Sequence, residues 1–159
     1  MNYKITPIRR DFLIKVRQAG IDDQNQPVIR QVATGGEPCR DVLRRAAVGE
    51  ELILASYCPF SIPGPYKEYG AVFVLAKQSS EWVNYDEFPI PNNATNDYFG
   101  EIFVLKAYDK YESIIAAQLV TPENVEQIIT EYFQQTKASF LMARYAAYGC
   151  YSLRLDRKV

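Results

Sequence analysis

Four apolar runs constrain the fold of this 159-residue chain most strongly. They cover residues 52–58, 71–76, 102–108 and 113–120, and few polar side chains interrupt them. A strand that lacks polar alternation is covered on both faces and lies inside its sheet. Each run is also far shorter than the roughly 20 apolar residues that a membrane-spanning helix needs. We therefore expect these runs to form central strands of one substantial sheet.

Shorter strand patterns lie towards the two ends of the chain. Residues 3–8 and 28–32 alternate well enough to predict two short strands. Residues 140–145 and 150–155 predict a further pair, joined near residues 146–149 as a hairpin. The sheet is therefore expected to be mostly antiparallel.

The clearest helix signal begins at Thr121. This hydroxyl residue suits an N-cap, Pro122 suits the first helical position, and Glu123 places a carboxylate in the first turn. Apolar side chains then recur at helical spacing, so we expect an amphipathic helix over residues 122–137 that lies on the sheet. A shorter helix is expected over residues 10–19.

A third short helix is predicted over residues 38–47. Pro38 suits its first position, Gly49 suits its end, and Asp41 and Arg45 are spaced to pair across one turn. The apolar residues recur at i, i+3, i+4 and i+7 and are Cys39, Val42, Leu43 and Ala46. Together, these strands and helices predict a single α+β domain over residues 1–159.

The position of Cys39 in this predicted helix allows two interpretations. In the first, the helix dipole and the neighbouring Arg40 favour the thiolate, which would make Cys39 a reactive thiol or part of an anion-binding corner. In the second, Cys39 is a small apolar residue on the buried face of the helix. The second is favoured, because free cysteine is among the most buried residue types.

Two segments without regular patterns could contribute to a site. Residues 59–69 hold three prolines and a glycine, and their aromatic side chains could line a pocket or cover the edge of the core. Residues 79–100 are expected to form a packed irregular excursion, with a helical turn near residues 82–88, because disordered segments are poor in aromatic residues.

The charge balance and the N-terminus exclude several classes of protein. Eighteen basic and nineteen acidic residues without a polybasic block leave no electrostatic footprint for nucleic acid or an anionic membrane. The first residues lack the apolar core of a secretory signal. We therefore expect a cytoplasmic protein with no nucleic-acid or membrane partner.

The chain contains no histidine. Histidine is the commonest metal ligand and the usual general base near neutral pH, so Ser-His and Cys-His catalysis are excluded. The three cysteines are widely separated and lack the close pairs of zinc sites. No metal and no cofactor are expected, and two cysteines could form a disulfide only if the fold brings them together.

Several short sequence motifs occur in order along most of the chain and resemble those of a bacterial family catalogued as domain of unknown function 1203. The resemblance carries no activity, because none is established for the family. It is incomplete at Leu75 and Met142, where members often carry histidine. The motifs begin at Gly36, Leu43, Gly49, Tyr57, Pro65, Gly70 and Ala146, and the residues that keep the family pattern include Cys39, Arg40, Tyr57, Tyr66, Arg144, Gly149 and Cys150.

These residues lead to three hypotheses of function. The first is a site for a small anionic ligand, binding or enzymatic, with Cys39 as the candidate nucleophile. The second is a protein-interaction or structural module, with a homodimer as its simplest form, because twelve tyrosines are available for an interface. The third is thiol redox sensing. In the first hypothesis the binding residues are Arg40, Tyr57, Tyr66, Arg144 and Cys150.

Overall fold

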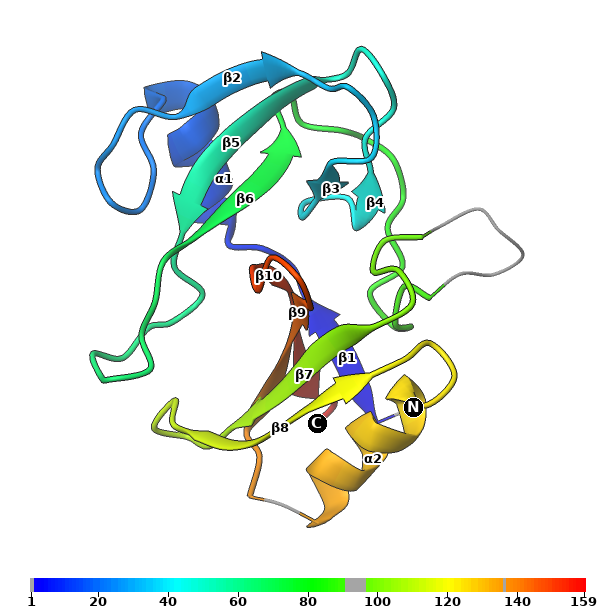
Figure 1. Cartoon of the computed structure of the whole chain (residues 1–159). Coiled ribbons are helices and arrows are strands. Elements are labelled where there is room, and N and C mark those ends of the chain that lie inside the picture. Colours follow the sequence, from blue (N-terminus) through cyan, green and yellow to red (C-terminus); the bar gives the residue numbers. More distant parts are fainter. Residues whose placement is uncertain (1, 91–96, 136) are drawn as a thin grey trace.

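The computed structural model describes residues 2–90, 97–135 and 137–159. It contains two five-stranded sheets, mostly antiparallel, and two helices (Figure 1). The predicted α+β class is confirmed, but the prediction of one substantial sheet is wrong. Residues 3–6, 103–120 and 140–157 pair with one another in one sheet, whereas residues 29–75 pair among themselves in the other.

The first sheet holds both ends of the chain, and all its strand pairs are antiparallel. Helix α2 (Val125–Gln135) packs on one face of this sheet, with Ile129 and Phe133 buried against Leu105 and Leu155. The order of the strands is β1 (Tyr3–Thr6), β10 (Tyr151–Arg157), β9 (Phe140–Tyr145), β7 (Phe103–Tyr108) and β8 (Ile114–Val120).

The second sheet is formed by the middle of the sequence, and its one parallel pair joins β3 to β6. Helix α1 (Arg10–Ile14) continues into the π-helical turn η1 (Lys15–Ala19), which packs against β5. The order of the strands is β2 (Ile29–Val32), β5 (Glu51–Tyr57), β6 (Gly70–Leu75), β3 (Pro38–Cys39) and β4 (Arg44–Arg45).

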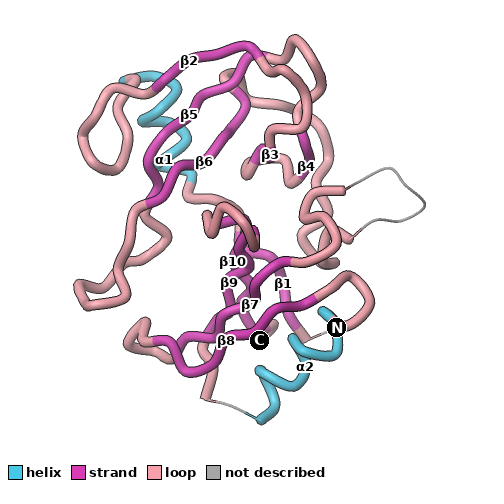
Figure 2. The backbone as a smooth tube through the Cα atoms, viewed as in Figure 1, coloured by secondary structure: helices cyan, strands magenta, loops and turns pink. Residues whose placement is uncertain are grey.

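One cluster of buried side chains joins the two sheets. Ile53 and Val74 of the second sheet share it with Tyr108 and Met142 of the first, and Phe12 of α1 lies in the same cluster. Figure 2 shows the two groups of strands facing each other, with loops at their margins. The side of the first sheet opposite α2 therefore faces the second sheet.

Most of the predicted elements are confirmed. Helices are present at residues 10–19 and 125–135, and the strand runs and the terminal hairpin form as expected. The prediction that all four apolar runs are central is wrong for β8, which is an edge strand with largely exposed side chains. The outer edge of β8 faces solvent, so the apolar residues of this run do not indicate a strand buried inside the sheet.

The predicted helix at residues 38–47 is wrong. Its apolar residues are buried as expected, but Pro38 and Cys39 pair with Arg45 and Arg44 as a hairpin. Leu43 has φ 52° in the turn between them, a left-handed value that breaks a right-handed helix. The backbone N–H of Arg40 donates to Phe73 O of β6, so this segment finds its hydrogen bonds in the second sheet.

The segment between β6 and β7 is irregular where it is described, as predicted. Phe88, Tyr98 and Phe99 are buried, and the ring of Phe99 stacks on Phe103 at 4.4 Å between centroids. The predicted helical turn near residues 82–88 is wrong, since these residues contain a bend at 85–87 and no helical turn. Residues 91–96 of this predicted irregular segment lie outside the described residues. No helix in the described ranges is long and apolar enough to cross a membrane.

Arg44 ties the β3–β4 hairpin to its surroundings and predicts a specific acid sensitivity. Its guanidinium donates to Glu50 and Glu81 at 2.7 Å each. The hydrogen bond from Arg44 lowers the pKa of Glu50 from 4.5 to about 2, and the same guanidinium lowers the pKa of Glu81. A folded-state pKa below the unfolded one stabilises the protein above about pH 4.5, and this contribution is lost as the pH falls towards 2.

We predict that Arg44→Gln removes this contribution. Since the carboxylates are partly exposed, the loss at pH 7 should be about 1 kcal/mol in free energy of unfolding, and it should shrink below pH 4. Urea unfolding at pH 7 and pH 3 measures it. Arg30→Gln is the control, because Arg30 is exposed and donates to a backbone carbonyl. A loss for Arg44→Gln that is equal at both pH values would contradict the assignment.

Candidate functional site

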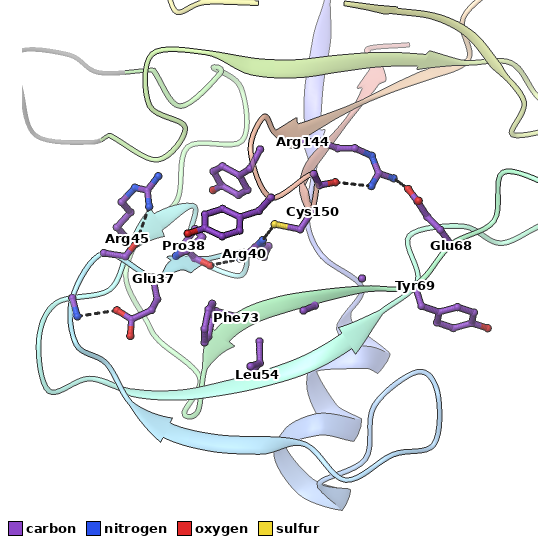
Figure 3. A pocket seen from close by; sticks show the side chains of 17 residues that line it. Glu37, Pro38, Arg40, Arg45, Leu54, Glu68, Tyr69, Phe73, Arg144 and Cys150 are labelled. Atoms are coloured by element: carbon purple, nitrogen blue, oxygen red, sulfur yellow. Dashed lines mark hydrogen bonds and ion pairs between the residues drawn. The ribbon is translucent and has the colours of Figure 1, made fainter. Parts of the chain in front are cut away.

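A cavity of about 670 Å³ lies between the two sheets. Its wall comes from three parts of the chain: the loop and hairpin at residues 35–45, the β5–β6 pair with the residues just before β6, and the turn between β9 and β10. This volume is in the usual range for small-molecule sites. Its charged side chains are Arg40, Arg45, Arg144, Glu37 and Glu68, and the remaining lining is mostly aromatic or apolar (Figure 3).

Arg40 is the most buried of the three arginines, with 3% of its surface exposed. Its Nε donates to Tyr151 O at 2.9 Å and its Nη1 to Pro38 O at 2.7 Å, so one guanidinium joins β10 of the first sheet to β3 of the second. Its Nη2 donates to the Sγ of Cys150 at 3.2 Å. All these acceptors are neutral groups, and no carboxylate in the described ranges forms an ion pair with Arg40.

Arg45 has a similar set of partners. It donates to the carbonyl oxygens of Gly36 at 2.7 Å, Asp97 at 2.5 Å and Tyr98 at 3.2 Å. The guanidinium carbons of Arg40 and Arg45 lie 5.2 and 5.8 Å from the centre of the Tyr145 ring. An aromatic ring attracts cations through its face, so Tyr145 holds two positive charges close together without neutralising either.

Arg144 is the one cavity arginine with a carboxylate partner among the described residues. Its Nη2 forms an ion pair with Glu68, and its Nη1 donates to Gly149 O at 3.2 Å. The side chain of Arg144 is 7% exposed and that of Glu68 is 48% exposed. The Nε of Arg144 is buried and has no hydrogen-bond partner in the described part of the chain. A buried donor without a partner is costly, which favours a site that an additional acceptor completes.

Some turns in the cavity wall depend on glycines with positive φ. Gly36 has φ 91° and Gly149 has φ 71°, values that side chains rarely permit. The carboxylate of Glu37 accepts hydrogen bonds from the backbone N–H groups of Thr34 and Gly35 at 2.9 and 2.8 Å. Burial raises the pKa of Glu37, but these hydrogen bonds outweigh it and lower the pKa overall. The carboxylate of Glu37 is therefore negatively charged and is held by hydrogen bonds within its own loop.

Three of the predicted site residues meet in the cavity: Arg40, Arg144 and Cys150. They come together because the β9–β10 turn lies over the β3–β4 hairpin, and Figure 3 shows Cys150 pointing at Arg40 between the two sheets. The cavity therefore brings two of the predicted arginines together with the thiol of Cys150, but it does not include Cys39, the candidate nucleophile, and the predicted helix is absent.

The other three predicted residues lie elsewhere. Cys39 is fully buried in a cluster with Leu52 and Leu75, does not line the cavity, and has its pKa raised to about 12 by burial. Tyr57 lies in the core between the sheets, where its hydroxyl accepts a hydrogen bond from Arg9 N. Tyr66 is in an exposed loop and does not line the cavity.

Sequence reasoning missed Arg45, Glu68, Tyr145 and Tyr148. The spacing of Asp41 and Arg45 predicts an ion pair between them, but this prediction is wrong, because Asp41 pairs with Arg17 at 2.8 Å. A signal existed for Tyr148, because the predicted hairpin placed it at an exposed turn, where it is 90% exposed at the cavity rim. No local signal could have found Glu68, which reaches Arg144 only through the tertiary fold.

The site does not have the composition of a metal centre. The described residues contain no group of three or more Cys, Asp or Glu side chains that could hold an ion. The three cysteines are free thiols. The donors that converge on the cavity are guanidinium groups, which bind anions and repel metal ions.

Comparison with protein families gives one match. The family model described as a protein of unknown function (DUF1203) matches residues 36–157, which include every residue of the cavity except Gly35. Searches of curated proteins and of solved structures found no match.

Proposed function

The chain belongs to the DUF1203 family, and we propose that the cavity between its sheets binds a small organic anion. The observation that carries the proposal is the state of Arg40, a buried cation whose described partners are all neutral. Burying a charge without a counter-charge costs several kcal/mol, and an anion in the cavity would offset that cost.

The lining favours an anion with an apolar or aromatic body. Phe73, Leu54 and Tyr145 provide apolar surface beside the arginines, and the exposed rings of Tyr69 and Tyr148 lie at the rim. Guanidinium groups pair with carboxylates through two parallel hydrogen bonds, and aromatic side chains contribute contact area at low entropic cost. Aromatic carboxylates are therefore the first class of ligand to test.

Glu68 supports the same assignment. It places a carboxylate of the protein itself against Arg144, at the edge of the cavity. Glu68 is half exposed and belongs to a run of exposed residues, 61–69, so it can leave at lower cost than a buried group. A ligand carboxylate that displaces Glu68 would take over an ion pair that the fold already forms.

We predict that benzoate raises the melting temperature and that benzamide, its uncharged analogue, does not. A ligand at about 100 times its Kd stabilises the folded state by about 2.7 kcal/mol. Arg45→Gln should reduce the effect by weakening the positive field. Glu68→Gln should increase it, because the competing carboxylate is gone. Thermal unfolding at several ligand concentrations provides the measurement.

Arg30→Gln is the matched control, since Arg30 lies on β2 and does not line the cavity. It should leave the response to benzoate unchanged. Equal shifts with benzoate and benzamide, or a benzoate shift that survives Arg45→Gln and ignores Glu68→Gln, would refute the anion site.

A homodimer is the second candidate. β8 is an edge strand, and its Ile115 and Leu119 side chains are 40% and 62% exposed. An exposed apolar edge strand can pair with the same strand of another copy. We predict a dimer by light scattering that Leu119→Lys converts to a monomer. A wild-type chain that is monomeric at high concentration would rule this arrangement out.

A further inference from the structure

Cys150 is the thiol that the cavity presents to a ligand. It lines the cavity and is only partly buried, whereas Cys39 and Cys58 are 0% and 6% exposed and do not line it. Cys58 lies in the core between the sheets, with its Sγ 3.5 Å from Phe60 O. A reagent that enters the cavity therefore meets one sulfur.

The surroundings of Cys150 are positively charged. Its sulfur accepts a hydrogen bond from Arg40 at 3.2 Å, and Arg45 and Arg144 line the same cavity. Arg144 adds an independent indication of a ligand, because its side chain is more than nine-tenths buried and its Nε has no partner among the described residues. Negative charge that develops on the sulfur thus lies against a fixed cation.

The side chains of this protein limit the reactions that Cys150 can undergo. The chain has no histidine, so acyl transfer would lack the usual acid for its leaving group. Thiol–disulfide exchange needs no such acid, because a thiolate attacks a disulfide sulfur and a second thiolate leaves unaided. The arginines select the charge of the partner, and the cavity volume limits it to a small molecule.

We propose that Cys150 is a site of mixed-disulfide formation with small anionic disulfides. This proposal rests on the anion site described above. In the step, the sulfur of Cys150 attacks one sulfur of R–S–S–R, a new S–S bond forms to Cys150, and the original S–S bond breaks. The second RS⁻ leaves with the electron pair and takes up the thiol proton directly or through water. The disulfide is reduced and Cys150 is oxidised, so no further oxidant is needed.

Native protein and three disulfides of different charge test the proposal. These are dithiobis(2-nitrobenzoate), which is anionic, hydroxyethyl disulfide, which is neutral, and cystamine, which is cationic. Each rate is divided by that of a free cysteine peptide to remove intrinsic reactivity. We expect the normalised rate of the anionic reagent to exceed that of cystamine by about tenfold or more and to fall with added salt.

Mass spectrometry should find one label per chain, on Cys150, and Cys150→Ser should abolish it. Arg45→Gln should reduce the preference for the anionic reagent, and the control Arg30→Gln should not. Equal normalised rates for all three reagents, or labels on Cys39 or Cys58 in the native protein, would overturn the proposal.

A separate measurement distinguishes this step from the anion site itself. The melting temperature is followed with 2-nitrobenzoate, an anion that lacks a disulfide. A rise with this anion, together with normalised rates that do not depend on charge, would refute the covalent step and leave the anion site intact. If the melting temperature does not rise and the normalised rates do not depend on charge, both the anion site and the covalent step are refuted.

Discussion

The guanidinium of Arg40 is the contact on which the cavity depends. It links distant parts of the chain, because it donates both to Tyr151 O at the start of β10, 111 positions away, and to Pro38 O in β3. Through these hydrogen bonds the β9–β10 turn of the first sheet is held over the β3–β4 hairpin of the second. The same group lines the space that it creates. A side chain that fixes the geometry of the cavity thus also gives it a positive charge, so the structure of the cavity and the proposed preference for anions depend on the same residue.

The regular elements could largely be predicted from local patterns. The helix that became α2 carries a start signal and an apolar stripe, and the run that became β5 is apolar throughout, so local sequence was sufficient for both. Residues 38–47 show where this fails. The spacing of Cys39, Val42, Leu43 and Ala46 fits a helix, and all four side chains are buried. Burial in a tight hairpin produces the same spacing, and only the partner strand β6 decides between them.

The site could be predicted in part. Arg40, Arg144 and Cys150 were identified from the sequence, and the fold brings them together. Cys39 is buried, which was the favoured interpretation of its position, and this leaves no accessible thiol for its alternative role as the candidate nucleophile. In the hairpin, Cys39 turns into a cluster with Leu52 and Leu75, and the neighbouring Arg40 points the opposite way to meet Cys150. Adjacent residues of an extended segment point to opposite sides, whereas adjacent residues of a helix lie about 100° apart around its axis.

We propose that the guanidinium groups of the cavity act together as one anion site. Nuclear magnetic resonance of the arginine Nε–H groups, recorded during a titration with 2-nitrobenzoate, tests it most directly. If these groups form one site, the signals of Arg40, Arg45 and Arg144 should move together and saturate at one ligand per chain, while that of Arg30 stays in place. Signals that do not move, or that move equally for all arginines without saturation, would contradict it.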